Sequence, residues 1–214
     1  VIGFGGQDRA GEEVRRAIEN LPGGKARPLL VSDASRPTTT KTRVMARKHQ
    51  VVRFDREVVD DLVHLADRLC ILVEEAVHEA DVLVLEDYNK GVLTPAVIRA
   101  GIAAAQRAGI PVVVDPKFRN IFEYRGATVF KPNAHELTSA MGVPIRPDDD
   151  GWLSEARNRF ECQHLVVTLG EQGMVAISAD GRCLRVPAIA REVYDVSGAG
   201  DTVTACIAVA LGAG

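Results

Sequence analysis

Continuous apolar runs alternate along the chain with segments whose apolar residues recur every three or four positions. The runs at 82–85, 110–114 and 165–167 predict strands that are buried on both faces. The segment 95–108 predicts a helix, with Thr94 as N-cap and a glycine after its end. Further strands are predicted at 29–31 and 128–130, and further helices at 8–20, 58–79, 135–141 and 154–160. Such alternation predicts a parallel sheet with helices on both faces, which is a three-layer α/β fold.

Two segments depart from this pattern. Residues 32–56 alternate polar and apolar positions, which predicts an antiparallel ribbon with Lys41, Arg43 and Arg47 on one face. That face is either a solvated sheet surface or a cationic binding surface. The short runs 174–177 and 183–186 flank a turn and predict a hairpin at the edge of the main sheet.

A glycine-rich stretch, Asp195–Thr202, precedes the apolar segment 203–211. Gly198, Ala199 and Gly200 are expected at a helix N-terminus, where free N–H groups and the helix dipole can hold an anion such as a phosphoryl group. Asp201 in the first turn can accept a proton from a hydroxyl. The alternative is a glycine loop in which Asp201 only favours the start of the helix.

Polar stretches follow four of the predicted strands, where an open α/β sheet binds its ligands. Each of them alone is also compatible with an ordinary capped loop, and Asn133 followed by Glu136 has the spacing of a capping box. The four stretches are 86–91, 115–117, 131–136 and 168–173.

Composition excludes several classes of function. The chain has 26 basic and 29 acidic residues and a net charge of −3, so neither nucleic acid nor an anionic membrane is an expected partner. Its four cysteines form no C-x-x-C pair, which favours reduced thiols and a cytoplasmic location. No apolar run approaches the roughly 20 residues of a membrane span.

The stretch Asp195–Thr202 resembles the signature of the ribokinase (PfkB) family of carbohydrate kinases. The resemblance implies a ribokinase-like three-layer fold with a small β lid at about residues 32–56. It also implies that Asp201 is the catalytic base and that Gly198, Ala199 and Gly200 form the anion hole.

The same resemblance implies a nucleotide and metal site. Asn133 and Glu136 match the family's N-x-x-E motif, which organises Mg²⁺ and phosphate oxygens largely through water. ATP would also contact the glycine loop formed by Thr168, Gly170 and Gly173. Asp195 and Ser197 match positions that bind a monovalent cation such as K⁺ in some relatives.

Within this family, the succession of motifs from Asp87 to Val196 resembles the heptose 7-phosphate kinases of ADP-heptose synthesis, which serve lipopolysaccharide core assembly. The implied reaction phosphorylates the 1-hydroxyl of D-glycero-β-D-manno-heptose 7-phosphate. Glu86 and Asn89 depart from the pattern, since Ser and Gly are expected there, and Leu169-Gly170 replaces an Arg-Ser pair. The expected substrate-binding residues are Lys41, Arg43, Lys90, Asp115 and Lys117.

We expect a single kinase domain over residues 1–214, with the family's outermost segments lying before Val1 and after Gly214. A homodimer through the lid is also expected. Two alternatives stay open: another PfkB-type sugar kinase, or a non-catalytic nucleotide- or sugar-binding module. The presence of Asp201, Asn133 and Glu136 favours the enzyme, and the absence of a Walker motif argues against a P-loop kinase.

Overall fold

The computed structural model describes residues 1–46, 49–189 and 198–214. Two compact units are distinguished within it. The first comprises residues 1–73 and 90–97, and the second comprises 74–89 and 98–214. The prediction of a single domain over the whole chain remains a prediction.

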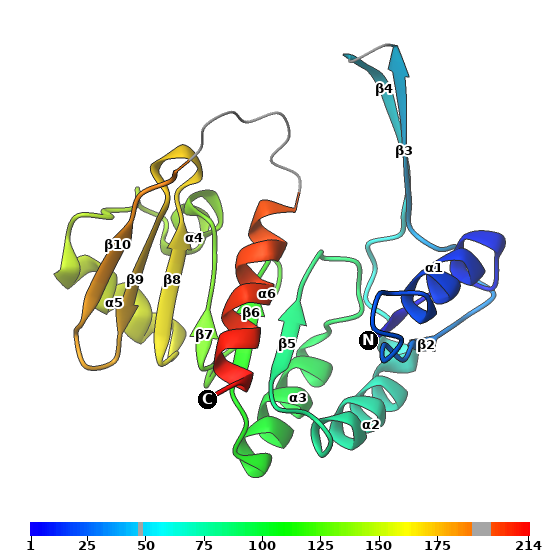
Figure 1. Cartoon of the computed structure of the whole chain (residues 1–214), viewed down its shortest axis with the longest axis horizontal. Helices are drawn as coiled ribbons and strands as arrows, with labels where there is room; N and C mark the ends of the chain where they lie inside the picture. Colours follow the sequence, from blue (N-terminus) through cyan, green and yellow to red (C-terminus); the bar gives the residue numbers. More distant parts are fainter. Residues whose placement is uncertain (47–48, 190–197) are drawn as a thin grey trace. The chain divides into compact units, whose positions relative to one another are not determined.

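The second unit is built on a six-stranded sheet with the order β10-β9-β8-β7-β6-β5 (Figure 1). Its first four strands along the chain pair in parallel, whereas β9 and β10 are antiparallel to their neighbours. This confirms the mainly parallel sheet and the predicted edge hairpin. The strands are β5 Leu83–Glu86, β6 Val112–Asp115, β7 Val129–Phe130, β8 His164–Thr168, β9 Met174–Ser178 and β10 Cys183–Val186.

Helices cover both faces of this sheet, as predicted. Val129 of β7 packs in one apolar cluster with Ala208 of helix α6. The next residue, Phe130, points to the opposite face, and its ring stacks on Phe160 of α5 with centroids 4.7 Å apart. The helices are α3 Pro95–Ala108, α4 Ala134–Met141, α5 Asp150–Phe160 and α6 Ala199–Gly212, with a 3₁₀ turn, η2, at Gly170–Gln172.

The central strands show why their sequences lack alternation. All four residues of β6 are buried, because both faces of the strand are covered. Burial of each valine contributes roughly 1.5–3 kcal/mol relative to exposure. The strand ends at Asp115, which is also buried and must therefore find a polar partner.

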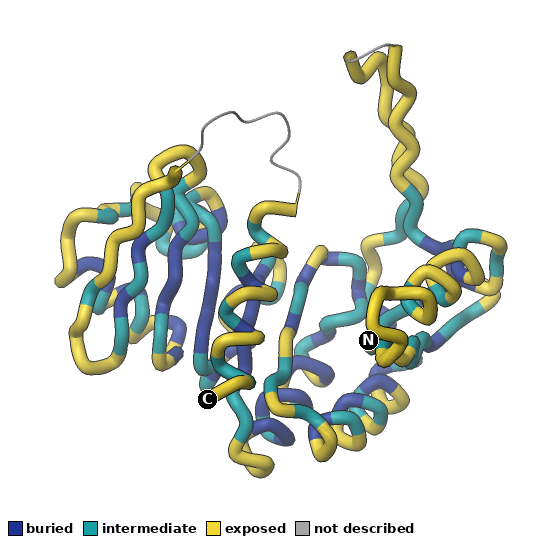
Figure 2. Tube along the Cα trace, in the orientation of Figure 1, coloured by how far each residue is buried: buried dark blue, intermediate teal, exposed yellow. Residues whose placement is uncertain are grey.

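The first unit contains two small sheets. Strands β1 Ile2–Phe4 and β2 Leu29–Val31 pair in parallel, and helix α1 Arg9–Glu19 lies between them in the sequence. The ribbon of β3 Thr40–Ala46 and β4 His49–Arg56 is antiparallel, as predicted for the lid, and nearly all of its described residues are exposed (Figure 2).

One helix starts later than predicted. The expected helix 58–79 is replaced by a loop, a 3₁₀ turn, η1 Val63–Leu65, and then helix α2 Ala66–Val77. The cause is Arg36, whose buried guanidinium donates hydrogen bonds to the carbonyl groups of Val58 and Asp60. Those carbonyl groups are held by a side chain distant in sequence, which hydrophobic periodicity does not reveal.

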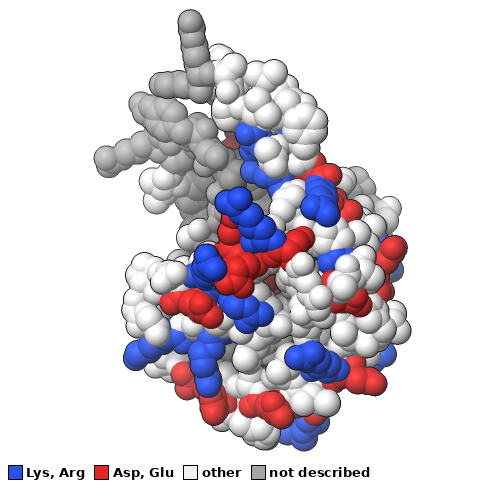
Figure 3. Space-filling model, turned by 90° about the vertical axis from the view of Figure 1, so that its right-hand side faces the viewer, with Lys and Arg blue, Asp and Glu red and all other residues white. Residues whose placement is uncertain are grey.

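The surface charge and the helices of the structure agree with what the composition predicts. On the face drawn in Figure 3, lysine and arginine side chains are interspersed with aspartate and glutamate. Among the described residues, no helix combines the length and apolar character needed to cross a bilayer.

Candidate active site

Helix α6 begins at a glycine turn. Gly198 has φ 81° and ψ 3°, a left-handed conformation that favours glycine, and Thr202 N–H makes an early helical bond to its carbonyl at 2.9 Å. No side chain among the described residues caps this N-terminus. The N–H groups of the first turn are therefore available to an anion. Asp195 and Ser197, the predicted monovalent-cation ligands, lie outside the described residues.

Asp201 lies in the first turn of α6 and is exposed. The hydroxyl group of Tyr88 donates a hydrogen bond of 2.9 Å to its Oδ2 atom. Burial and this bond to Asp201 raise the pKa of Tyr88, so the phenol stays a hydrogen-bond donor at any physiological pH. The bond fixes one oxygen of the Asp201 carboxylate.

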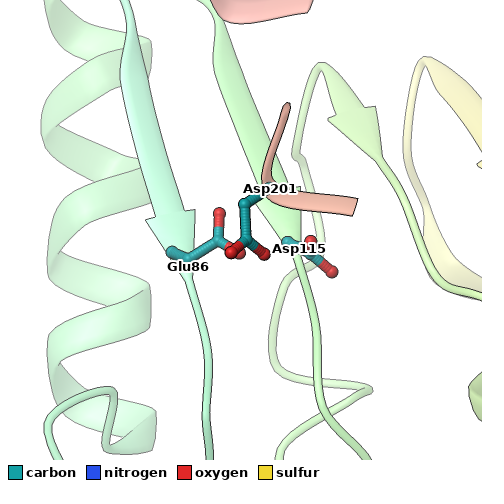
Figure 4. Close-up of side chains that lie close together, drawn as sticks. All are labelled: Glu86, Asp115 and Asp201. Carbon is teal, nitrogen blue, oxygen red and sulfur yellow. The ribbon is translucent and has the colours of Figure 1, made fainter. Parts of the chain in front are cut away.

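Three carboxylates converge at this point. Glu86 ends β5, Asp115 ends the neighbouring strand β6, and one oxygen from each lies within 4.8 Å of an oxygen of Asp201 (Figure 4). Burial, followed by the charges of Asp115 and Asp201, raises the pKa of Glu86 to about 7. Glu86 was a departure from the family pattern in the sequence, but no function was predicted for it.

A buried lysine balances part of this charge. Lys131 Nζ lies 2.7 Å from Asp115 Oδ2, and the same oxygen accepts a hydrogen bond of 3.2 Å from Thr204 on α6. A Cβ atom added to Gly200 would lie 3.6 Å from Lys131 Nζ, so the ammonium group sits close to the glycine turn. Asp115 was predicted to bind substrate, whereas here it is buried and joins β6 to Lys131 and α6.

Asn133 and Glu136 form the N-terminal capping box of α4. Asn133 Oδ1 accepts from Glu136 N–H, and Glu136 Oε2 accepts from Asn133 N–H, both at 2.9 Å. The other carboxylate oxygen of Glu136 lies 2.5 Å from Lys117 Nζ. Lys117 is partly buried, which lowers its pKa, but the hydrogen bond to Glu136 outweighs this and raises it overall. Both oxygens of Glu136 are thus engaged, so it suits a metal-bound water better than direct coordination.

A cavity of about 820 Å³ opens beside the N-terminus of α6. It brings together most of the predicted nucleotide residues, and it has the size of a typical small-molecule site. Gly173 closes one side, where a Cβ atom would lie 2.0 Å from the carbonyl oxygen of Val186. The predicted residues that line the cavity are Asn133, Thr168, Gly170, Gly173, Ala199 and Gly200.

The four predicted cations are distributed over both units. Lys41 and Arg43 are exposed on β3, and Lys90 pairs with Glu57 at 2.7 Å, all within the first unit. Lys117 belongs to the second unit and pairs with Glu136. Lys90 and Lys117 therefore already have carboxylate partners.

A family model described as "pfkB family carbohydrate kinase" matches residues 1–214. The chain belongs to this family. This match confirms the family expected from the sequence. The described part of the signature, residues 198–202, forms the glycine turn and the first turn of α6.

Curated relatives of this pfkB-family chain are longer than the chain itself. A protein of Azorhizobium caulinodans named "Bifunctional protein HldE" is 45% identical over 217 residues, covering all of this chain and 45% of the relative. A protein of the same name from Caulobacter sp. is 43% identical over 222 residues, covering 100% of this chain and 44% of the relative. The chain thus spans a little under half the length of the curated relatives it matches.

Solved structures confirm the ribokinase-like fold. Arabidopsis thaliana ribokinase, complexed with ribose and ATP, matches with a TM-score of 0.75 and 22% identity, covering 100% of this chain and 69% of that one. The tetrameric inhibited form of Escherichia coli phosphofructokinase-2 also matches with a TM-score of 0.75 and 22% identity, covering 99% of this chain and 69% of that one.

Proposed function

We propose that this chain carries out ATP-dependent phosphoryl transfer to a sugar phosphate, with D-glycero-β-D-manno-heptose 7-phosphate as acceptor at its 1-hydroxyl. The observation that carries the proposal is the position of Asp201. Its carboxylate stands in the first turn of α6, whose N-terminus lines the 820 Å³ cavity and has no side-chain cap among the described residues. A base and an anion-binding turn are therefore adjacent, as phosphoryl transfer to a hydroxyl requires.

In the proposed reaction, Asp201 accepts the proton of the acceptor hydroxyl as that oxygen forms its bond to the γ-phosphorus and the bond to ADP breaks. Tyr88 holds the Oδ2 atom of the Asp201 carboxylate in place by donating a hydrogen bond to it. The N–H groups of Ala199 and Gly200 stabilise the charge on the transferring phosphoryl group. Positioning and electrostatics supply most of the catalysis in this type of reaction.

The cavity suits the nucleotide. Gly170, Gly173, Ala199 and Gly200 are among the residues that line it. Glycines allow phosphate oxygens to approach backbone N–H groups closely. Mg²⁺, when bound, neutralises phosphate charge, and Glu136 would hold it through water because both of its oxygens already have partners. K⁺ binding by Asp195 and Ser197 remains part of the proposal.

The charged side chains on one face of the β3–β4 ribbon support the proposal that the acceptor is phosphorylated. Arg43 lies directly opposite Arg53 in the antiparallel register, and Lys41 lies opposite Asp55 on the same face. Arg53 pairs with Asp55 at 3.0 Å, and Arg43 beside this pair adds positive charge that a bound phosphate would neutralise. The resemblance to the heptose 7-phosphate kinases, and the relatives named HldE, direct the choice of acceptor to a heptose phosphate.

The exposed apolar side chains on the opposite face of the ribbon support the proposal of a homodimer formed through the lid. Val44 pairs with Val52 on that face, and Phe54 lies beside them with 61% of its surface exposed. An isolated two-stranded ribbon is only marginally stable, so an apolar face of this kind requires a covering surface. Phe54→Asp is expected to shift the protein from dimer to monomer in sedimentation velocity, while Arg53→Asp on the other face leaves the dimer intact.

The deciding experiment compares acceptors with the full-length natural protein. Heptose 7-phosphate, fructose 6-phosphate and ribose are each incubated with ATP and Mg²⁺, and ADP release is measured. Turnover of the heptose phosphate at least about tenfold above the other two supports the proposal. Preference for another sugar would establish a different pfkB-type kinase, and nucleotide binding without turnover of any acceptor would establish a non-catalytic module.

A further inference from the structure

Glu86 occupies a position that the proposed mechanism does not use. Register pairs it with Asp115 across β5 and β6, and its carboxyl group points toward Asp115 and Asp201 (Figure 4). The resemblance described in the sequence analysis leads us to expect a serine at this position, and Glu86 adds a third carboxyl group to Asp115 and Asp201. When it is ionised, a glutamate at this position adds a negative charge next to Asp201, the proposed base.

The groups that face Glu86 come from four segments. Asp115 and Asp201 are acidic, and Lys131 is a buried cation held 2.7 Å from Asp115. Tyr88 is a neutral donor on Asp201, and Lys117 contributes a more distant positive charge that Glu136 already neutralises. With every carboxyl group ionised, three negative charges would face the single charge of Lys131. The cluster therefore favours a proton on one of its carboxyl groups.

Glu86 is the carboxyl group best placed to hold that proton. Asp115 has its ion pair with Lys131 and its hydrogen bond from Thr204, both of which favour an ionised carboxylate. Asp201 is exposed and accepts from Tyr88. Among the described residues, Glu86 has neither an ion pair with a cation nor a hydroxyl donor, and its side-chain hydrogen bond is with Asp115. The pKa of about 7, produced by burial and by the neighbouring carboxylates, agrees with this assignment.

We propose that Glu86 is a positioning residue that works as a neutral carboxylic acid, donating a hydrogen bond to Asp115 and keeping a further negative charge away from Asp201. This inference rests on the proposed function, because Asp201 is the base of that reaction. Glu86 itself exchanges no proton with the acceptor, whose proton goes to Asp201. Ionisation of Glu86 places a negative charge within 4.8 Å of Asp201, beside the turn that receives the anionic phosphoryl group.

The consequence is a loss of turnover as Glu86 ionises. A like charge at this separation, partly screened by solvent, is expected to lower kcat by roughly tenfold between about pH 6 and pH 9. Glu86→Gln mimics the neutral acid, and Glu86→Ser restores the residue of the family pattern. Both variants are expected to lack this alkaline decline, and Glu86→Gln, whose amide can still donate to Asp115, is expected to be more active than Glu86→Ser.

A spectroscopic measurement on the full chain tests the proton directly. At about pH 6 the wild type is expected to show the infrared carbonyl stretch of a protonated carboxyl group, absent from Glu86→Gln and lost near pH 9. If wild type and Glu86→Gln give the same spectra, the inference is wrong. Disappearance of the band on addition of Mg²⁺ would also overturn it, since the three carboxylates would then hold a cation.

The infrared and kinetic results separate this inference from the proposed function. If no acceptor is phosphorylated, the proposed function fails, whereas the infrared band still decides whether Glu86 holds the proton. If turnover is present and the alkaline decline persists in both Glu86→Gln and Glu86→Ser, the proposed function stands and the role of Glu86 is refuted.

Discussion

Lys131 and Asp115 form a buried ion pair next to the glycine turn of α6. Their side chains are 2% and 9% exposed, and Nζ lies 2.7 Å from Oδ2. A buried charge is costly unless it is paired and hydrogen-bonded, so removal of one partner leaves the other without compensation. The pair links the ends of β6 and β7 under the start of α6, and the geometry of the site depends on it.

Lys131→Met should therefore destabilise the protein by about 3–5 kcal/mol, the usual cost of breaking a buried pair. The double variant Lys131→Met with Asp115→Asn should recover at least about half of that loss, because no isolated charge remains. Chemical denaturation of the wild type, both single variants and the double variant measures the coupling. A cost below about 1 kcal/mol for Lys131→Met would show that the pair contributes little.

Asp201→Asn tests the proposed base. Turnover should fall at least about 10²-fold, because the amide cannot accept the hydroxyl proton, while ATP affinity and unfolding temperature stay near wild type. Asp67→Asn is the matched control, since Asp67 is an exposed first-turn aspartate on α2. Near-normal turnover of Asp201→Asn in a steady-state assay would refute the assignment.

The parts of the site that follow one another in the sequence could be predicted, because local chemistry determines them. The turn of Gly198 to Gly200 and the placement of Asp201 follow from glycine and helix-start signals. The capping box of Asn133 and Glu136 was likewise predictable, because the two residues are three positions apart in the sequence. The alternation of strands and helices gave the layers of the second unit.

Contacts between distant segments could not be predicted. Glu86 meets Asp115 only because β5 and β6 are neighbours with a particular register. Lys131 was visible as one residue of a strand-end motif, but nothing local shows that it is buried against Asp115. Arg36 similarly shortens the predicted helix by binding the Val58 and Asp60 carbonyl groups. These outcomes depend on tertiary packing rather than on periodicity.

The free energy of unfolding should depend on pH through the ionisation of Glu86. Its folded-state pKa is raised from 4.5 to about 7, so the folded state binds its proton more tightly than the unfolded state does. The resulting stabilisation is complete below the unfolded pKa and is lost as pH rises through the window from 4.5 to about 7. Glu86→Gln lacks this loss.

The expected result is that Glu86→Gln becomes more stable relative to wild type as pH increases across that window. Because Glu86 is only partly buried and solvent screens its charge, the effect should be near 1 kcal/mol, or roughly 2–4 °C in Tm. The quantity to measure is the Tm difference between the two proteins at about pH 4.5 and pH 8. A difference that does not change with pH would mean that folding leaves the pKa of Glu86 unshifted.

Glu136→Gln tests the metal contact. Since Glu136 already binds Lys117 and Asn133 N–H, its expected contact with Mg²⁺ is through water. The variant should raise the Mg²⁺ concentration for half-maximal rate by about tenfold and leave the KM of the sugar nearly unchanged. Glu155→Gln, on the exposed side of α5, is the control. A changed sugar KM with normal Mg²⁺ dependence would assign Glu136 to the acceptor subsite.

The cationic face of the lid ribbon provides the test of acceptor charge. Arg43 and Lys41 share that face with Arg53, and Arg43 lies directly opposite Arg53. Charge-assisted hydrogen bonds to phosphate contribute roughly 1.5–3 kcal/mol each, so Arg43→Ala or Lys41→Ala should raise the KM of the phosphorylated acceptor by about ten- to a hundredfold. The KM of ATP should not change.

Thr42→Ala supplies the matched control, because Thr42 lies between these residues in sequence and faces the other side of the ribbon, opposite Phe54. It should leave both KM values at wild type. Steady-state kinetics with heptose 7-phosphate and with the unphosphorylated heptose completes the comparison. If Arg43→Ala and Lys41→Ala weaken use of both sugars equally, the ribbon acts by closing over the sugar rather than by binding its phosphate. If the wild type uses the unphosphorylated heptose as well as the phosphate, the site has no requirement for the anion.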